Sequence, residues 1–102
     1  MTRVAGDAGP RVVLYTTSWC PHCHSAKALL ERRGIAYQEV DGEQVWGTRF
    51  RDEIEKRTGG RTVPQVVIDG RPIGGNAELH QLDDEGGLKK LLGKPAPRAG
   101  AD

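Results

Sequence analysis

The sequence lacks the features that would assign it by composition to a membrane or to nucleic acid. No apolar run approaches the ~20 residues that span a bilayer, and residues 1–11 contain no apolar stretch of the roughly 7 to 15 residues typical of a secretory signal. Neither sign of charge is in excess, because 15 lysines and arginines stand against 14 aspartates and glutamates. We therefore expect a cytoplasmic monomer that binds neither nucleic acid nor membrane.

Cysteine is equally scarce. The sequence has two, Cys20 and Cys23, and both stand in one CxxC within the segment SWCPHCHSAKALL. In a reducing compartment such a pair is more often catalytic or metal-binding than a structural staple. The segment is compatible with a zinc half-site, a haem attachment site or a redox couple.

The further ligands that zinc or haem would require are few. A closed zinc site needs four ligands, and beyond His22 or His24 the sequence offers His80 but no second cysteine pair. Covalent haem at a CxxCH usually comes with an export signal and a second axial ligand, for which Met1 or His80 is present. These absences favour the redox couple over both alternatives.

What the sequence does contain is an alternation of strand and helix patterns. Residues 12–15 are a continuous apolar run, typical of a strand buried on both faces. Trp46, Phe50 and Ile54 recur every fourth residue, which predicts an amphipathic helix with these three side chains in the core. The order strand, helix, strand at the start of the chain indicates a parallel crossover.

Turn and cap residues mark the later elements. Asp69 and Gly70 predict a hairpin turn, and Pro72 places the strand after it at an edge of the sheet. Asn76 is a suitable cap for a last helix, which a pair of glycines divides in two. The expected order is β, α, β, α, β, β, α, over residues 12–15, 21–33, 35–40, 43–58, 65–69, 71–73 and 76–92.

The two ends of the chain differ in composition from its middle. Residues 1–10 and 93–102 are rich in glycine, proline and small side chains, which predicts a flexible N-terminus and a flexible C-terminal tail. The 82 residues between them, 11–92, have the size of one small α/β domain.

The CxxC at the start of a helix gives its two sulfurs different expected roles. Only the thiolate attacks a disulfide, and an ordinary cysteine, with a pKa of about 8.5, is mostly protonated at neutral pH. If Pro21 is the first helical residue, Cys20 is the cap, and the free N–H groups of the helix start favour its anion. Cys23, one turn later, can close a disulfide with Cys20. We therefore expect Cys20 to be the nucleophile and Cys23 the resolving thiol.

Together with TVP and GG further along the chain, this segment resembles the glutaredoxins, specifically the small dithiol class whose motif is CPYC. The matching stretches are VVLYTTSWCPHCHSAKALLERRGI, RDEIEKRTGGRTVPQVVIDGRPIGG and the helix that begins NAEL. The resemblance implies a thioredoxin fold, with a four-stranded mixed sheet in the order 2-1-3-4 flanked by three helices. It also implies a cis peptide bond between Val63 and Pro64.

The resemblance further implies a glutathione-dependent thiol–disulfide oxidoreductase that reduces protein disulfides and glutathione mixed disulfides. Glutathione would be the reducing co-substrate, with no metal and no permanently bound cofactor, and the partners would be disulfide-containing or glutathionylated proteins. Carried over by position, the glutathione-binding residues are Thr17, His22, Arg57, Thr62, Val63, Pro64, Gly75, Asn76, Ala77 and Glu78.

Within that set the family assigns separate tasks. Thr62 and Val63 would flank the tripeptide backbone, and the N–H groups of residues 75–77 would bind the γ-glutamyl carboxylate. Glu78 would meet the α-amino group, and Arg57 would bind the glycine carboxylate.

Four residues depart from the family pattern and leave the identity of the small thiol open. Thr17 stands where a lysine is common, and His22 replaces the usual tyrosine. Ala77 replaces a side chain that often forms a hydrogen bond, and Glu78 is one methylene longer than the family aspartate. The segment TTSWC also looks like the approach to the active site in mycoredoxins, which serve mycothiol. The alternatives are therefore a redoxin that depends on mycothiol or thioredoxin reductase, or a carrier of a [2Fe–2S] cluster.

Overall fold

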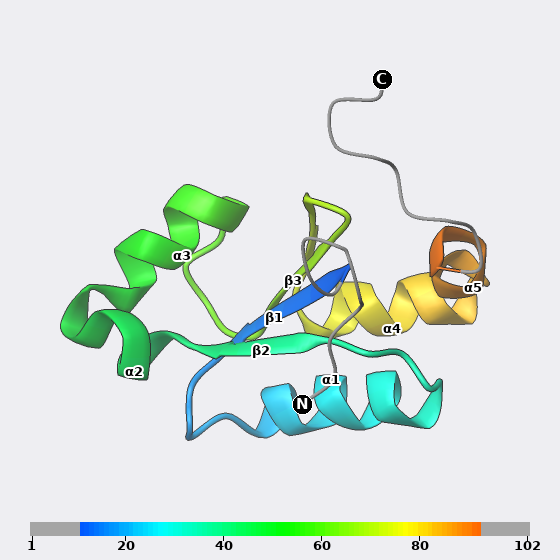
Figure 1. The fold of residues 1–102 in the computed structure, drawn as a ribbon, viewed down its shortest axis with the longest axis horizontal. Coiled ribbons are helices and arrows are strands. Elements are labelled where there is room, and N and C mark those ends of the chain that lie inside the picture. The colour runs from blue at the N-terminus through cyan, green and yellow to red at the C-terminus, as the bar shows by residue number, and fades with distance from the viewer. Residues whose placement is uncertain (1–10, 93–102) are drawn as a thin grey trace, which may run out of the picture.

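The computed structural model describes residues 11–92, which form a four-stranded sheet with helices packed around it (Figure 1). The predicted flexible ends, residues 1–10 and 93–102, lie outside the described residues. The elements are β1 (Val12–Thr16), α1 (Pro21–Arg32), β2 (Gln38–Asp41), α2 (Gly42–Trp46), the 3-10 helix η1 (Gly47–Arg49), α3 (Phe50–Thr58), β3 (Gln65–Ile68), β4 (Arg71–Gly74), α4 (Asn76–Asp84) and α5 (Gly87–Leu92).

The sheet has the strand order β2-β1-β3-β4, so the predicted order 2-1-3-4 and the mixed sheet are confirmed. β1 pairs with β2 in parallel, and β3 is antiparallel to both β1 and β4. Pro72 lies in β4 at the edge, as predicted, because an edge strand does not require its missing N–H. Asp69 and Gly70 join β3 to β4 with positive φ angles of 51° and 82°, the backbone that the predicted hairpin turn requires.

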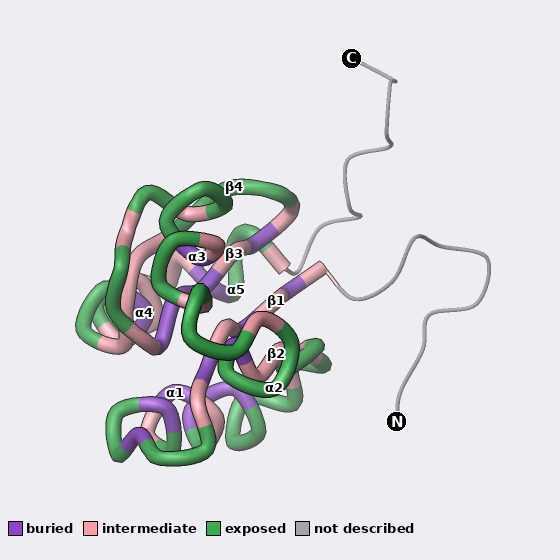
Figure 2. The backbone as a smooth tube through the Cα atoms, turned by 90° about the vertical axis from the view of Figure 1, so that its left-hand side faces the viewer, coloured by how far each residue is buried: buried purple, intermediate pink, exposed green. Residues whose placement is uncertain are grey.

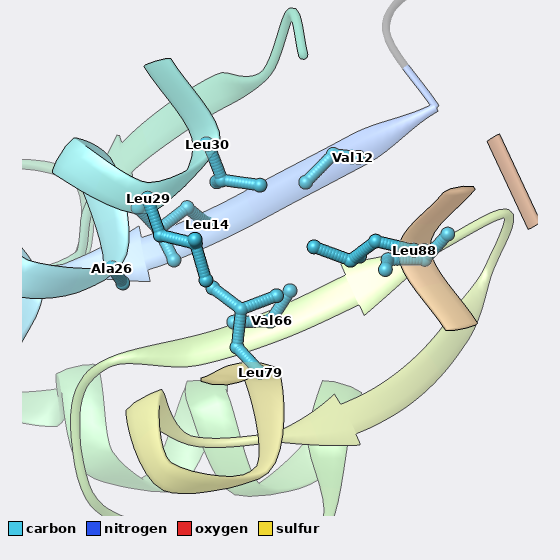
Figure 3. Packing of buried hydrophobic residues seen from close by; sticks show 9 residues of the cluster. Val12, Leu14, Ala26, Leu29, Leu30, Val66, Leu79 and Leu88 are labelled. Carbon is cyan, nitrogen blue, oxygen red and sulfur yellow. The ribbon is translucent and has the colours of Figure 1, made fainter. Parts of the chain in front are cut away.

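The main core lies between one face of the sheet and helices α1, α4 and α5. Figure 3 shows its side chains converging from these elements, including Leu14 of β1, Leu29 of α1 and Leu79 of α4. In β1 the residues that face this core, Val12, Leu14 and Thr16, are fully buried. Those between them are half-buried, so β1 is not equally buried on both faces as its apolar run predicts.

The other face of the sheet meets α2 and α3. Tyr15 points there, since side chains alternate along a strand, and its ring centroid lies 6.1 Å from that of Trp46. The prediction of one helix with three core residues is wrong here: Gly47, at φ 60°, interrupts it, and Trp46 and Phe50 are half-buried. Of these three residues only Ile54 is fully buried. Figure 2 shows that most of α2 is exposed.

One further boundary differs from the sequence prediction. β2 begins at Gln38 rather than at residue 35, because Ile35 and Tyr37 pack against the core before pairing starts. The predicted division of the last helix is confirmed, since α4 and α5 are separate and Gly86 between them has a φ of 78°. Among residues 11–92 no helix is long and apolar enough to cross a membrane.

Candidate active site

The first helix begins at the cysteine pair, and Cys20 is its cap. Cys20 has extended backbone angles, φ −158° and ψ 102°, and Pro21 follows as the first helical residue. The Cys20 Sγ accepts a hydrogen bond from the backbone N–H of Cys23 at 3.2 Å. A sulfur in this position lies over the N–H groups that a helix start leaves unpaired, where negative charge is favoured.

Both thiols are free, and both are largely shielded from solvent. Cys20 is 8% exposed and Cys23 is 2% exposed. Burial, followed by the hydrogen bond with Cys20, raises the pKa of Cys23 to about 12, although a backbone contact with Thr17 and the charge of Lys27 act in the opposite direction. Cys23 is therefore a protonated thiol at neutral pH.

The segment before β3 brings a carbonyl group to the first cysteine. The peptide bond between Val63 and Pro64 is cis, as the family resemblance implied, and the Cys20 thiol donates to the Val63 carbonyl at 3.7 Å. Thr62, one residue earlier, is exposed, and its hydroxyl accepts a bond from Gln65 Nε2 at 3.4 Å. The CxxC and TVP motifs are therefore in contact, although Cys20 and Val63 are 43 residues apart in the chain.

The glycine pair before α4 lies against the same segment. A Cβ atom on Gly75 would stand 3.3 Å from the Pro64 carbonyl oxygen, which is a tight contact. Glycine therefore allows these two segments of backbone to lie close together. Gly74 has a φ of 124°, and a Cβ there would lie 2.8 Å from Cγ of Glu78. The three motifs of the sequence therefore converge.

The start of α4 differs from its sequence prediction. Gly75, not Asn76, is the cap, and the Gly75 N–H donates to the Glu78 carboxylate at 2.8 Å. Asn76 takes the first helical position, and its Oδ1 is buried without a hydrogen-bond partner among the described residues. The Glu78 carboxylate thus occupies one of the three N–H groups expected to serve a ligand carboxylate. Ala77 is exposed beside it.

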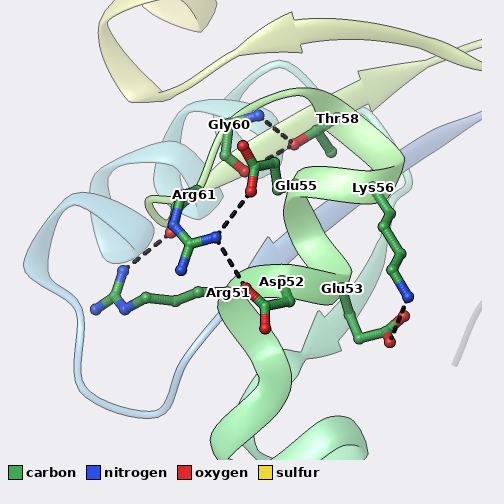
Figure 4. Close-up of polar contacts among 8 residues, drawn as sticks. All are labelled: Arg51, Asp52, Glu53, Glu55, Lys56, Thr58, Gly60 and Arg61. Atoms are coloured by element: carbon green, nitrogen blue, oxygen red, sulfur yellow. Dashed lines mark hydrogen bonds and ion pairs between the residues drawn. The ribbon is translucent and has the colours of Figure 1, made fainter.

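Two arginines, one in α3 and one in the loop after it, are engaged in ion pairs with carboxylates of α3. Arg57 pairs with Glu53 at 2.7 Å and lies over the Trp46 ring, 4.6 Å from its centroid. Figure 4 shows Arg61 bridging the carboxylates of Asp52 and Glu55, at 2.9 and 2.8 Å. These arginines form exposed ion pairs, which stabilise the helix only modestly.

Two of the positions that depart from the family pattern, Thr17 and His22, lie within three residues of Cys20 in the chain. The Thr17 hydroxyl donates to the Trp19 carbonyl at 3.3 Å, and Trp19 itself is 84% exposed. His22 is exposed as well. The surface next to the first sulfur therefore presents an indole and an imidazole rather than a cation and a phenol.

The histidine considered for zinc or haem is committed elsewhere. His80 Nε2 shares a hydrogen bond with Ser25 Oγ at 3.1 Å, across the contact between α1 and α4. Among residues 11–92 no group of three or more histidine, cysteine or acidic side chains could hold a metal ion. A hollow of about 500 Å³ lies at the far end of α1, next to Ile35 and Leu88, and neither cysteine lines it.

One polar cluster near the cysteines was not predicted. Lys27 Nζ lies 3.2 and 3.3 Å from the two carboxylate oxygens of Glu39, and the fully buried Thr16 hydroxyl donates to Glu39 at 2.8 Å. The spacing of Lys27, four residues after Cys23, was the available signal. Glu39 joins this cluster because of the register in which β2 pairs with β1, and the sequence around Glu39 does not indicate that register.

Comparison with known proteins agrees with this arrangement. The Glutaredoxin family model matches residues 12–73. The chain is 47% identical over 83 residues to Glutaredoxin 3 of Escherichia coli, covering 79% of this chain and 95% of that protein. It is 44% identical over 85 residues to the glutaredoxin of Pseudomonas aeruginosa, covering 81% and 96%.

Solved structures agree as well. The crystal structure of the buckwheat glutaredoxin–glutathione complex superposes with a TM-score of 0.75 at 29% identity, over 82% of this chain and 77% of that one. The described fold, the convergence of CxxC, TVP and GG, and the similarity to bacterial glutaredoxins lead to one conclusion. The chain belongs to the glutaredoxin family of thiol–disulfide oxidoreductases.

Proposed function

We propose that the protein reduces protein disulfides and glutathione mixed disulfides through Cys20 and Cys23, with glutathione as the reducing co-substrate. The unequal setting of the two sulfurs carries this proposal. Cys20 caps α1 and accepts the Cys23 N–H at 3.2 Å, whereas burial keeps the pKa of Cys23 at about 12. One sulfur is thus suited to attack first and the other to act afterwards.

The reaction follows from these roles. The Cys20 thiolate attacks a substrate disulfide, forming a mixed disulfide and releasing one substrate sulfur as a thiolate that takes up a proton. With a glutathionylated protein, Cys20 accepts the glutathionyl group and a second glutathione removes it as glutathione disulfide. With a protein disulfide, Cys23 attacks Cys20, which forms the Cys20–Cys23 disulfide and releases the second substrate thiol. Two glutathione molecules then restore both thiols.

The proposed glutathione site extends from Cys20 across residues 62–64 to the start of α4. The Val63 backbone, whose carbonyl lies 3.7 Å from the Cys20 sulfur, can pair with a peptide-like ligand as an added strand. Asn76 and Ala77 offer N–H groups at the helix start to the γ-glutamyl carboxylate. Because Glu78 occupies the Gly75 N–H, the ligand either uses the other two or displaces Glu78.

The remaining residues of the proposed site differ in whether an existing contact would have to break before they bind the ligand. His22 and Thr62 are exposed and Thr17 is half-buried, and their positions in the chain next to the cysteine pair and Val63 allow them to contact the ligand. Arg57 would have to leave its ion pair with Glu53 to bind the glycine carboxylate. That pair is exposed, so the exchange is inexpensive.

A panel of reductants tests the proposal. The protein is mixed with a small glutathione mixed disulfide, glutathione, glutathione reductase and NADPH, and NADPH consumption is followed by absorbance. We expect turnover with glutathione. Parallel reactions replace glutathione by mycothiol with its reductase, or by thioredoxin reductase alone. No turnover with glutathione, together with turnover in one of the parallel reactions, would contradict the proposed co-substrate while leaving the dithiol chemistry intact.

Anaerobic reconstitution with iron and sulfide separates the enzyme from a cluster carrier. We expect no stable visible chromophore, because Pro21 after the first cysteine is unfavourable to a cluster held between two copies. A stable, dimeric chromophore that depends on glutathione would favour the carrier. We place the activity in the cytoplasm, because reduction of Cys20 and Cys23 by glutathione requires a reducing compartment.

A further inference from the structure

We propose that Lys27 is a positioning residue for the second step of the dithiol reaction, in which its ammonium group, fixed by Glu39 and Thr16, stabilises the Cys23 thiolate. This inference rests on the proposed function, since only a dithiol mechanism requires Cys23 to ionise. It assigns a task to a polar cluster that the glutathione site does not use. The cluster joins α1 to β2 next to the resolving cysteine.

The helix places Lys27 near Cys23. Residues four apart on a helix are neighbours on one face, so the side chain of Lys27 begins one turn beyond the buried sulfur. Lys27 is partly shielded, with 27% of its side chain exposed. A charge in such a position acts on a neighbouring thiol more strongly than one in open solvent, because screening by water is incomplete.

The sheet fixes where the ammonium group can lie. Glu39 stands opposite Leu14 in the parallel pair of β1 and β2, so its side chain reaches the face of the sheet that α1 covers. The hydroxyl of Thr16, which is fully buried, donates to Glu39 Oε2 at 2.8 Å. Glu39 in turn holds Lys27 Nζ at 3.2 and 3.3 Å. The lysine is therefore anchored rather than free to extend into water.

The chemistry of Cys23 makes such an anchor useful. Burial raises the pKa of Cys23, and the hydrogen bond and charge of Cys20 raise it further, whereas a backbone hydrogen bond with Thr17 and the positive charge of Lys27 lower it. Cys20 and Lys27 are the ionisable groups that act on Cys23. Glu39 pairs with Lys27 and offsets part of its positive charge. Cys23 is therefore mostly protonated at neutral pH, but a larger fraction of it is thiolate than burial alone would give.

The step concerned balances without any further reactant. Cys23 gives up its proton, its sulfur attacks the Cys20 sulfur of the mixed disulfide, and a Cys20–Cys23 bond forms as the bond from Cys20 to the substrate breaks. In this step Cys23 is oxidised and the departing substrate sulfur is reduced, and over both steps of the reaction the two cysteines give two electrons to the substrate disulfide. The departing substrate sulfur leaves as a thiolate and takes up one proton, which balances the proton lost by Cys23.

The test isolates Cys23 in a Cys20→Ser background, which contains one thiol, and needs no glutathione. The rate of alkylation by iodoacetamide is measured as a function of pH for the background and for added Lys27→Met, Lys27→Arg and Lys56→Met. Lys56 is a matched control, since it also pairs with a glutamate, Glu53, on an exposed helix surface. We expect Lys27→Met to slow alkylation about threefold at a given pH, equivalent to an upward shift of about 0.5 pH unit in the profile.

The conservative variant and the sign of the effect separate this role from a structural one. Lys27→Arg keeps the charge and should restore most of the rate, and Lys56→Met should leave it unchanged. If Lys27 only braced α1 against β2, its loss would loosen the helix and expose Cys23, so alkylation would accelerate. An unchanged or faster rate in Lys27→Met would overturn the proposal. Because glutathione is absent, this result is independent of the reductant panel.

Discussion

Two helices begin beside the same segment, residues 63–64, and their first turns are closed in different ways. At α1 the cap is Cys20, whose sulfur accepts the Cys23 N–H at 3.2 Å. At α4 the cap is Gly75, whose own N–H is taken by the carboxylate of Glu78 at 2.8 Å. Both starts carry the partial positive charge of a helix N-terminus. At α1 this partial charge faces the reactive sulfur of Cys20, and at α4 it faces the carboxylate of Glu78.

The difference explains why chemistry is expected at one start and recognition at the other. The Cys20 sulfur at the α1 cap is a weak hydrogen-bond acceptor, and the same atom can attack a disulfide. At α4 the Glu78 carboxylate is a charged acceptor for the N–H of the Gly75 cap, and it keeps the backbone in place whether or not a ligand is present. Breaking each cap should therefore affect different properties, catalysis for α1 and stability for α4.

The largest effect is expected from the α1 cap. Cys20→Ser should abolish reduction of both mixed and protein disulfides, because a hydroxyl group does not ionise at neutral pH. Cys23→Ser should spare the reduction of glutathione mixed disulfides, which requires only Cys20, and impair that of protein disulfides. Coupled NADPH assays with the two substrate types measure this. Inactivity of Cys23→Ser towards both substrates, with activity retained in Cys20→Ser, would reverse the assigned roles.

A smaller effect, on stability, is expected from the glycine that precedes the α4 cap. Gly74 has a φ of 124°, and an added Cβ would lie 2.8 Å from Glu78 Cγ. Gly74→Ala should therefore lower the free energy of unfolding by roughly 1–3 kcal/mol, through backbone strain and displacement of Glu78. Urea unfolding followed by circular dichroism measures it. Gly59→Ala is a useful control, since it also has a positive φ but an open surrounding, and should cost less. An equal loss for both would show that Glu78 does not matter.

The smallest effect is expected from the glutamate itself. Glu78→Ala removes the acceptor for the Gly75 N–H and should lower the free energy of unfolding by about 0.5–1 kcal/mol, the range of an exposed helix cap. Glu78→Gln keeps an oxygen acceptor at the same reach and should recover most of the loss. The same unfolding experiment applies. If the two variants were equally destabilised, the charge rather than the hydrogen bond would hold the start of α4.

The local part of this arrangement was predictable from sequence, and the part that depends on contacts between distant segments was not. Pro21 indicated the start of α1, and Pro72 indicated the edge strand, because proline restricts its own backbone in any context. Asn76 was assigned as a cap on propensity, but the chain places Gly75 there and uses Glu78 from within the helix. This hydrogen bond between Gly75 and Glu78 forms only because β4 ends at Gly74 and α4 begins directly after Gly75.

Burial was also harder to predict than spacing. Trp46 and Phe50 have helical spacing, yet Gly47 divides the helix, and both rings stay half-buried. Arg57 covers the Trp46 ring instead of lying free. The cluster of Lys27 with Glu39 follows from strand register, which is set by the packed sheet and not by either residue alone. The family resemblance supplied the cis bond before Pro64, which its neighbours in sequence do not dictate.

The most direct test of the central claim compares the two sulfurs one at a time. Cys23→Ser leaves only Cys20, and Cys20→Ser leaves only Cys23, so the rate of iodoacetamide alkylation near neutral pH reports each thiol separately. Burial is the main cause that raises the pKa of Cys23 to about 12, and it does not depend on Cys20, so the Cys23 thiolate should remain scarce at neutral pH in Cys20→Ser. We predict that Cys20 reacts more than about tenfold faster than Cys23. Equal rates, or a faster Cys23, would contradict the unequal roles on which the proposed function rests.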